Sequence, residues 1–190
     1  MESDTQASER GARPQLQPVD ASGTATLYLN RAWRFGGEIW LLTQAGKPVG
    51  MVERTAGRIA LRTFSGHWRG GARRRARRLG WHLYFTRAGG DGPALEYKPP
   101  STLVRSGHFY VSGIRRYRLR CPMLRADWKL AAVPRGEISR IGARVREAWR
   151  VQLACVNDVV DEPVLLVVVL AACGAILIHD EQPSGGAMGV

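Results

Sequence analysis

Short segments in which apolar and polar residues alternate fill most of the chain and predict β-strands. From Thr26 to Asn157 the dominant period is two, and turn residues interrupt it at short intervals. Glu38–Gln44 and Val49–Arg54, joined by AGKP, predict a β-hairpin. The other predicted strands are 58–64, 81–87, 95–98, 102–106, 108–113, 114–120, 127–133, 137–142 and 148–157. Ten to twelve strands at this spacing predict an antiparallel sandwich or barrel.

A run of fifteen uncharged residues, Val164–Ile178, departs from this pattern. It is too long for an ordinary strand and predicts a helix over 163–178, with Pro163 at the first helical position. At 1.5 Å per residue it spans about 22 Å, which is less than the roughly 30 Å hydrocarbon core of a bilayer. Neither end carries the Trp, Tyr, Lys or Arg anchors of a membrane span. We therefore predict a helix enclosed by the strands; a tail anchor and a buried strand pair are the alternatives.

The polar ends of the chain suggest a single domain with flanking segments. Residues 1–25 are polar, contain Pro and Gly and lack the apolar core of a secretory signal, so we predict a disordered leader. The predicted domain is 26–181, and 182–190 is predicted to be a flexible tail. Cys155 and Cys173 lie among apolar residues and predict small buried side chains. Three cysteines make no disulfide framework, which fits a reducing, cytoplasmic location.

The charge of the chain is unevenly distributed and favours anionic partners. The net charge is +12, and residues 151–190 contain five acidic residues and no Lys or Arg. All 28 basic side chains therefore lie in residues 1–150. Such an excess favours nucleic acid, anionic lipid or acidic proteins as partners, although it does not specify a fold.

The densest basic segment is HWRGGARRRARRLGWH, residues 67–82. One hypothesis is a loop between strands in which guanidinium groups bind lipid phosphates and a Trp lies at the membrane interface. One alternative is a nucleic-acid patch. The other is a merely solvated basic loop, or an Arg-rich strand edge kept apart by its own repulsion. Alternation in RRYRLR, residues 115–120, puts three arginines on one strand face, either extending this patch or facing solvent. The candidate anion-binding residues are Trp68, Arg69, Arg73, Arg74, Arg75, Arg77, Arg78, Trp81, Arg116 and Arg118.

Catalytic and cofactor signals are weak. The four histidines show no metal-ligand spacing, and none lies beside a nucleophile motif. No Gly-rich loop follows a strand and opens a helix, so we expect no bound nucleotide cofactor. The sequence thus predicts a binding module rather than an enzyme, with no metal and no cofactor.

Three stretches resemble the tubby C-terminal-like fold, in its branch of phospholipid scramblases and LURP-one-related proteins. They are EIWLLTQAGKPVGMVER, DWKLAAVPRGEISRI and WRVQLACVNDVVDEPVLLVVVLAACGAILIHDE. The resemblance covers Thr26 to Glu181 and looks like a small bacterial-type single-domain member. It implies a closed barrel of about twelve strands around a central helix, with roles at membranes: phosphoinositide binding in tubby proteins and lipid movement in scramblases.

The chain also departs from that branch. It lacks the Cys-rich cluster and the Pro-rich leader of scramblases. NDVVDEP, residues 157–163, stands where scramblases carry a proposed calcium segment, but it has neither alternating carboxylates nor a central Gly. We expect these acids to complement the helix N-terminus rather than to bind calcium, which places calcium-dependent scrambling in doubt.

Overall fold

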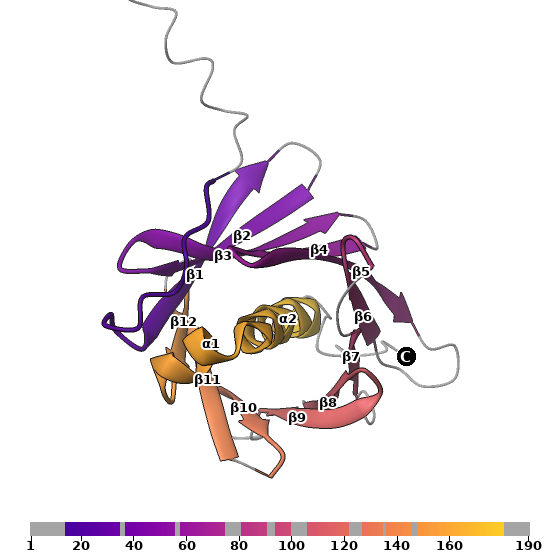
Figure 1. The fold of residues 1–190 in the computed structure, drawn as a ribbon. Coiled ribbons are helices and arrows are strands. Elements are labelled where there is room, and N and C mark those ends of the chain that lie inside the picture. The colour runs from indigo at the N-terminus through magenta and orange to yellow at the C-terminus, as the bar shows by residue number, and fades with distance from the viewer. Residues whose placement is uncertain are drawn as a thin grey trace, which may run out of the picture.

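Twelve antiparallel strands close into a barrel in the computed structural model of the chain (Figure 1). The structure describes residues 14–34, 37–55, 58–74, 81–90, 94–99, 106–121, 127–134, 136–145 and 148–180. Each strand pairs with its neighbours in sequence, and β1 pairs with β12 to close the ring. The strands are β1 (Thr26–Arg34), β2 (Gly37–Gln44), β3 (Lys47–Thr55), β4 (Arg58–Thr63), β5 (Gly66–Arg74), β6 (Trp81–Arg87), β7 (Leu95–Lys98), β8 (Ser106–Val111), β9 (Ile114–Arg120), β10 (Trp128–Ala132), β11 (Gly136–Val145) and β12 (Ala148–Leu153). The predicted antiparallel barrel is confirmed.

The period of two in the sequence directs alternate side chains of each strand, the apolar ones, into the barrel. In β4, Ile59 and Leu61 are buried, whereas Arg58, the first residue of the strand, is exposed. Two hairpin turns fix the register of neighbouring strands. Ala45 and Gly46 have φ values of 49° and 80°, and Ser112 and Gly113 have 50° and 82°. Two consecutive positive φ values are what a type I′ turn requires, and this turn suits the twist of the strands.

Helix α2 (Pro163–Asp180) runs through the centre of the barrel (Figure 1). Its middle section, Val167 to Ala172, has no exposed surface, so the predicted central helix over 163–178 is confirmed. Gly50 lets the helix approach β3 closely, because a Cβ atom there would lie 3.0 Å from both Leu170 methyl groups. In the described part of the chain, no helix combines the length and the apolar character needed to cross a membrane.

The end of the predicted last strand is helical in the structure. We predicted a strand over 148–157, but β12 ends at Leu153 and α1 (Val156–Asp161) follows. Asp158 in the first turn of α1 favours this helix start. Cys155 precedes α1 and is exposed, so the prediction that it is buried was wrong. Leu153 is buried and Val156 packs against the core, but Ala154 and Cys155 lie between the end of β12 and α1 and are exposed.

The segment before β1 is held against the barrel. The predicted disordered leader of residues 1–25 was wrong for residues 14–25, whose contacts the structure describes. The Gln17 N–H donates to the Pro48 carbonyl at 2.9 Å, and Val19 packs on the core. These contacts hold a polar segment against the end of the barrel, and its amino-acid composition does not predict them. Residues 1–13 and the predicted tail, 182–190, lie outside the described residues.

We expect Val168→Asp to unfold the protein, because it would place a lone carboxylate inside the barrel. Val168 has no exposed surface, and a buried unpaired charge costs at least about 4 kcal/mol, much of the stability of a domain this size. Circular dichroism during urea unfolding would measure the loss. Val160→Asp is the matched control, because Val160 is exposed on α1 and should tolerate the charge. A cooperatively folded Val168→Asp protein would contradict the central position of α2.

Candidate functional site

The Arg-rich segment at residues 67–82 is mostly strand rather than loop. β5 extends to Arg74 and pairs with β6, with Arg73 opposite His82 and Arg74 opposite Trp81. The predicted loop was therefore wrong for residues 69–74, because pairing with β4 reaches Gly71 and pairing with β6 continues to Arg74. The side chains of Arg73, Arg74 and Trp81 are outside what the structure describes, as are all of Arg75, Arg77 and Arg78.

Trp68 and Arg69, the first two candidate residues, face opposite sides of the barrel wall. Trp68 is only 5% exposed and belongs to the core, so it cannot lie at a membrane interface as predicted. Strand alternation is the reason, since Trp68 pairs with the inward-facing Leu61 of β4. The Arg87 guanidinium lies 5.8 Å from the centre of its ring. Arg69 is exposed and remains available to a ligand.

The arginines of β9 lie on the outer surface, as their alternation predicts. Arg116, Arg118 and Arg120 are exposed, whereas Tyr117 and Leu119 are buried. β9 and β5 are separated by β6, β7 and β8, a third of the way around the barrel. At about 4.8 Å per strand, this separation is about 19 Å along a convex wall. The two groups of arginines therefore form separate surfaces and not one patch.

Neighbouring strands extend the β9 arginines into two rows of cationic and titratable side chains. In the first row, Lys98 of β7 lies opposite His108 of β8, which lies opposite Arg118. In the second row, Arg120 lies opposite Lys129 of β10, which lies opposite Arg140 of β11. We call this surface the basic face. Its members are Lys98, His108, Arg115, Arg116, Arg118, Arg120, Lys129 and Arg140.

Two glutamates neutralise only the edges of the basic face. Glu96 forms an ion pair with Lys98, and hydrogen bonding by Lys98 holds the pKa of its carboxyl below the usual value. Burial opposes the ionised form of Glu137, but its contacts with Lys129 at 3.2 Å and Arg140 at 3.0 Å outweigh burial and lower its pKa. Within the described residues, no ion pair joins the three exposed arginines of β9. Like charges in adjacent strands repel, so an anion bound between them would stabilise the surface.

Exposed apolar side chains occupy hairpin turns at one end of the barrel. Ile114, after the β8–β9 turn, is 55% exposed, and Val133, after β10, is 42% exposed. The Val133 N–H donates to the Arg116 carbonyl at 2.8 Å, so this apolar pair flanks the basic face. Phe64 is exposed at the β4–β5 turn, at the same end of the barrel. Basic and apolar groups thus meet at one corner of the molecule.

A cleft of about 710 Å³ opens beside this corner, at the N-terminal end of α2. Its lining combines apolar side chains with Arg116 and the carboxylates of Glu137, Asp158, Asp161 and Glu162. In the ranges that the structure describes, no three His, Cys, Asp or Glu side chains are arranged to hold a metal ion. The cleft therefore has mixed charge and shows no specific ligand set.

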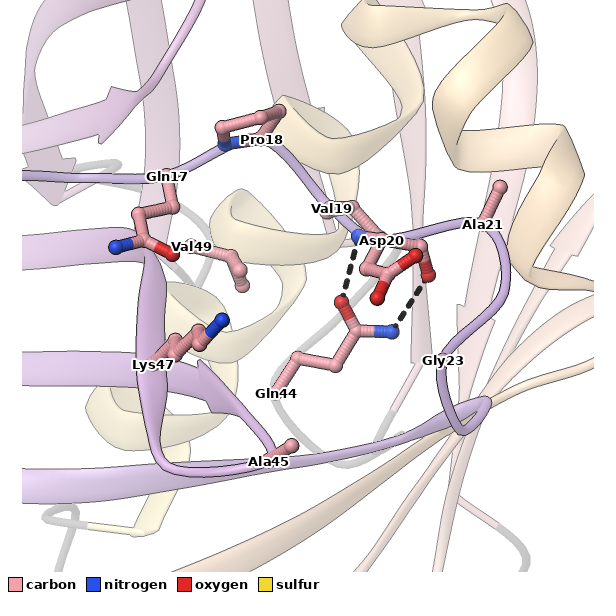
Figure 2. Close-up of a pocket in the computed structure, with 10 residues that line it drawn as sticks. All are labelled: Gln17, Pro18, Val19, Asp20, Ala21, Gly23, Gln44, Ala45, Lys47 and Val49. Carbon is pink, nitrogen blue, oxygen red and sulfur yellow. Dashed lines mark hydrogen bonds between the residues drawn. The ribbon is translucent and has the colours of Figure 1, made fainter.

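A second cavity, of about 420 Å³, lies beneath the segment 17–23 at the end of the β2–β3 hairpin (Figure 2). Gln44, which is only 4% exposed, points from the end of β2 toward this segment. Its Oε1 accepts from the Asp20 N–H at 2.8 Å, and its Nε2 donates to the carbonyls of Asp20 and Thr24 at 3.0 Å each. The Gln44 amide therefore holds the segment by main-chain atoms alone.

The buried cysteines show no sign of reactivity. Burial raises the pKa of the Cys173 thiol to about 12, so it remains protonated in neutral solution. Cys173 is therefore a packing residue, as its apolar neighbours predicted, and Cys121 is likewise buried in the core.

Sequence reasoning missed several residues of the basic face and the role of Gln44. His108, Lys98, Lys129 and Arg140 are single polar residues in alternating strands, and only the register between strands brings them together. Gln44 is the last residue of a predicted strand and falls on its inward face, which was the one available signal.

Comparison with protein-family models, curated proteins and solved structures finds no match for this chain. The resemblance to the tubby-like branch therefore stays a prediction.

We expect Gln44→Ala to release the segment 17–24 from the barrel, because two hydrogen bonds to the backbone of Asp20 and one to that of Thr24 are lost. Amide hydrogen exchange at Asp20 and its neighbours should accelerate, and the free energy of unfolding should fall by about 1–3 kcal/mol. Gln152→Ala is the control, because Gln152 is an exposed glutamine of β12. Unchanged exchange in Gln44→Ala would show that this amide does not hold the segment.

Proposed function

We propose that this protein is a non-enzymatic binding module that docks on anionic membrane surfaces through the basic face. The observation that carries this proposal is the outward row of Arg116, Arg118 and Arg120, which no ion pair within the described residues neutralises. Phosphate groups of lipids accept charge-assisted hydrogen bonds from guanidinium groups and would relieve their mutual repulsion. The proposed ligand class is therefore an anionic lipid headgroup.

The number of arginines suffices for reversible binding at a membrane. Each basic group near an anionic surface contributes about 1 kcal/mol, so three unneutralised arginines contribute about 3 kcal/mol, or roughly a hundredfold in affinity. Lys98, Lys129 and Arg140 add less, because Glu96 and Glu137 already neutralise part of their charge. Binding of this strength is peripheral and should weaken as salt is added.

The exposed apolar pair favours a membrane over nucleic acid as the partner. Ile114 and Val133 flank Arg116 at the end of the barrel and could enter the boundary between headgroups and acyl chains. A nucleic-acid backbone offers no comparable apolar layer for aliphatic side chains. The resemblance to the tubby-like branch also implies a membrane role. The absence of a disulfide framework favours the cytoplasmic side as its location.

We expect the triple variant Arg116→Glu, Arg118→Glu and Arg120→Glu to lose binding to phosphatidylglycerol vesicles. The change reverses three charges on one strand, so the fraction of protein sedimenting with vesicles should fall at least tenfold. Neutral phosphatidylcholine vesicles should bind neither protein. Circular dichroism would establish that the variant is folded, since all three side chains are exposed.

The matched control reverses Arg58, Arg69 and Arg150, which are exposed on β4, β5 and β12. Its net charge equals that of the β9 variant, so retained binding in the control would assign the effect to the basic face. Loss of binding in the control alone would move the site to the arginines of β4, β5 and β12. Salt-sensitive binding of duplex DNA without vesicle binding would overturn the proposal in favour of a nucleic-acid partner.

A further inference from the structure

His108 lies at the centre of the basic face. It is on the outer side of β8, opposite Lys98 of β7 and opposite Arg118 of β9, and it is half-buried between them. Its Nδ1 atom is buried and makes no hydrogen bond within the described part of the chain. The Nδ1 atom of this imidazole can therefore still form a hydrogen bond, for example with a ligand.

The groups around His108 disfavour its protonated form. Burial lowers the pKa of His108 below its ordinary value, and the cations of Arg115 and Arg118 lower it further. On β7, Glu96 is engaged by Lys98 and lies 3.6 Å from His82 of β6, so its charge is already shared. The Lys98 ammonium also lies 4.7 Å from the Tyr110 ring centre.

We infer that His108, Arg115 and Arg118 form a proton-linked anion site that takes one phosphate- or sulfate-like group and binds a proton with it. This inference rests on the proposed function, because the site lies on the basic face. His108 would couple ligand binding to pH. The negative group of the ligand would lie at one position between β8 and β9.

The coupling follows from the charges. An oxyanion held by the two guanidinium groups cancels the repulsion that they exert on an imidazolium, and it accepts a hydrogen bond from the protonated ring. The pKa of His108 therefore rises when the anion binds. By linkage, affinity rises as pH falls between the pKa of the complex and that of the free protein, by up to tenfold per pH unit.

Without the anion, the same group makes the fold weaker in acid. Because the folded pKa lies below the unfolded value of about 6.5, the unfolded chain binds the proton first. Stability is therefore complete above about pH 6.5 and decreases as pH falls toward the folded pKa. A bound anion opposes this effect, because it raises the pKa of His108.

The test is a titration of His108 by NMR from pH 8 to 5, with the imidazole signal assigned from His108→Gln. Sulfate is the soluble probe, because it does not titrate in this range, and phosphatidylglycerol vesicles supply the lipid form of the same chemistry. We expect both to raise the pKa of His108 and to bind more tightly at pH 5.5 than at pH 8. His67→Gln, on β5, is the control and should keep this dependence.

The variants separate the two proposals. As pH falls toward 5.5, the affinity of the unchanged protein should rise above that of His108→Gln. The gap should grow by up to about tenfold per pH unit between the pKa values of the free protein and the complex. Two results would overturn the proton-linked site and leave the membrane proposal standing. In the first, vesicles bind but do not change the pKa of His108. In the second, His108→Gln binds vesicles with the same pH dependence as the unchanged protein. A His108 shift with sulfate but no vesicle binding would support the site and overturn the membrane proposal. No effect of either probe would overturn both.

Discussion

An α-helix without a polar face has to contact apolar side chains all around its axis, and α2 meets this condition inside a closed ring of strands. Closure is also what removes unpaired strand edges, so one arrangement satisfies both the helix and the backbone of the sheet. The interior is consequently filled by side chains: Leu170 approaches β3 so closely that a Cβ atom at Gly50 would lie 3.0 Å from its methyl groups. The central helix therefore leaves little room for chemistry inside the barrel.

Binding groups are displaced to the outer wall and the ends of the barrel for the same reason. The alternation that directs Tyr117 and Leu119 inward directs the intervening arginines outward, so the packing of the core and the charge of the surface are two results of one pattern. Because the wall is convex, basic residues on distant strands diverge, and only those on adjacent strands can act on one ligand. Arg69 and Arg118 consequently belong to different surfaces although both were candidates for one site.

The fold was predictable because its determinants are local. Apolar alternation, turn residues and the length of Val164–Ile178 each act within a few residues, and together they predicted the barrel and α2. The site was less predictable because register is not local. Nothing near His108 in sequence indicates that Lys98 and Arg118 lie on either side of it, and Trp68 was assigned to the surface because its strand was taken for a loop.

Register also explains why a histidine at this position has a different character from a histidine in a loop. Each flanking strand brings positive charge toward His108, whereas the carboxylates nearest to the basic face are already engaged by Lys98, Lys129 and Arg140. The protein therefore holds an imidazole where its charged form is disfavoured until a negative group arrives. A rigid barrel maintains this opposition, because closure prevents the strands from sliding apart to relieve the repulsion. In the proposed anion site, a bound anion would relieve the repulsion between these like charges, so that the anion and a proton would favour each other's binding.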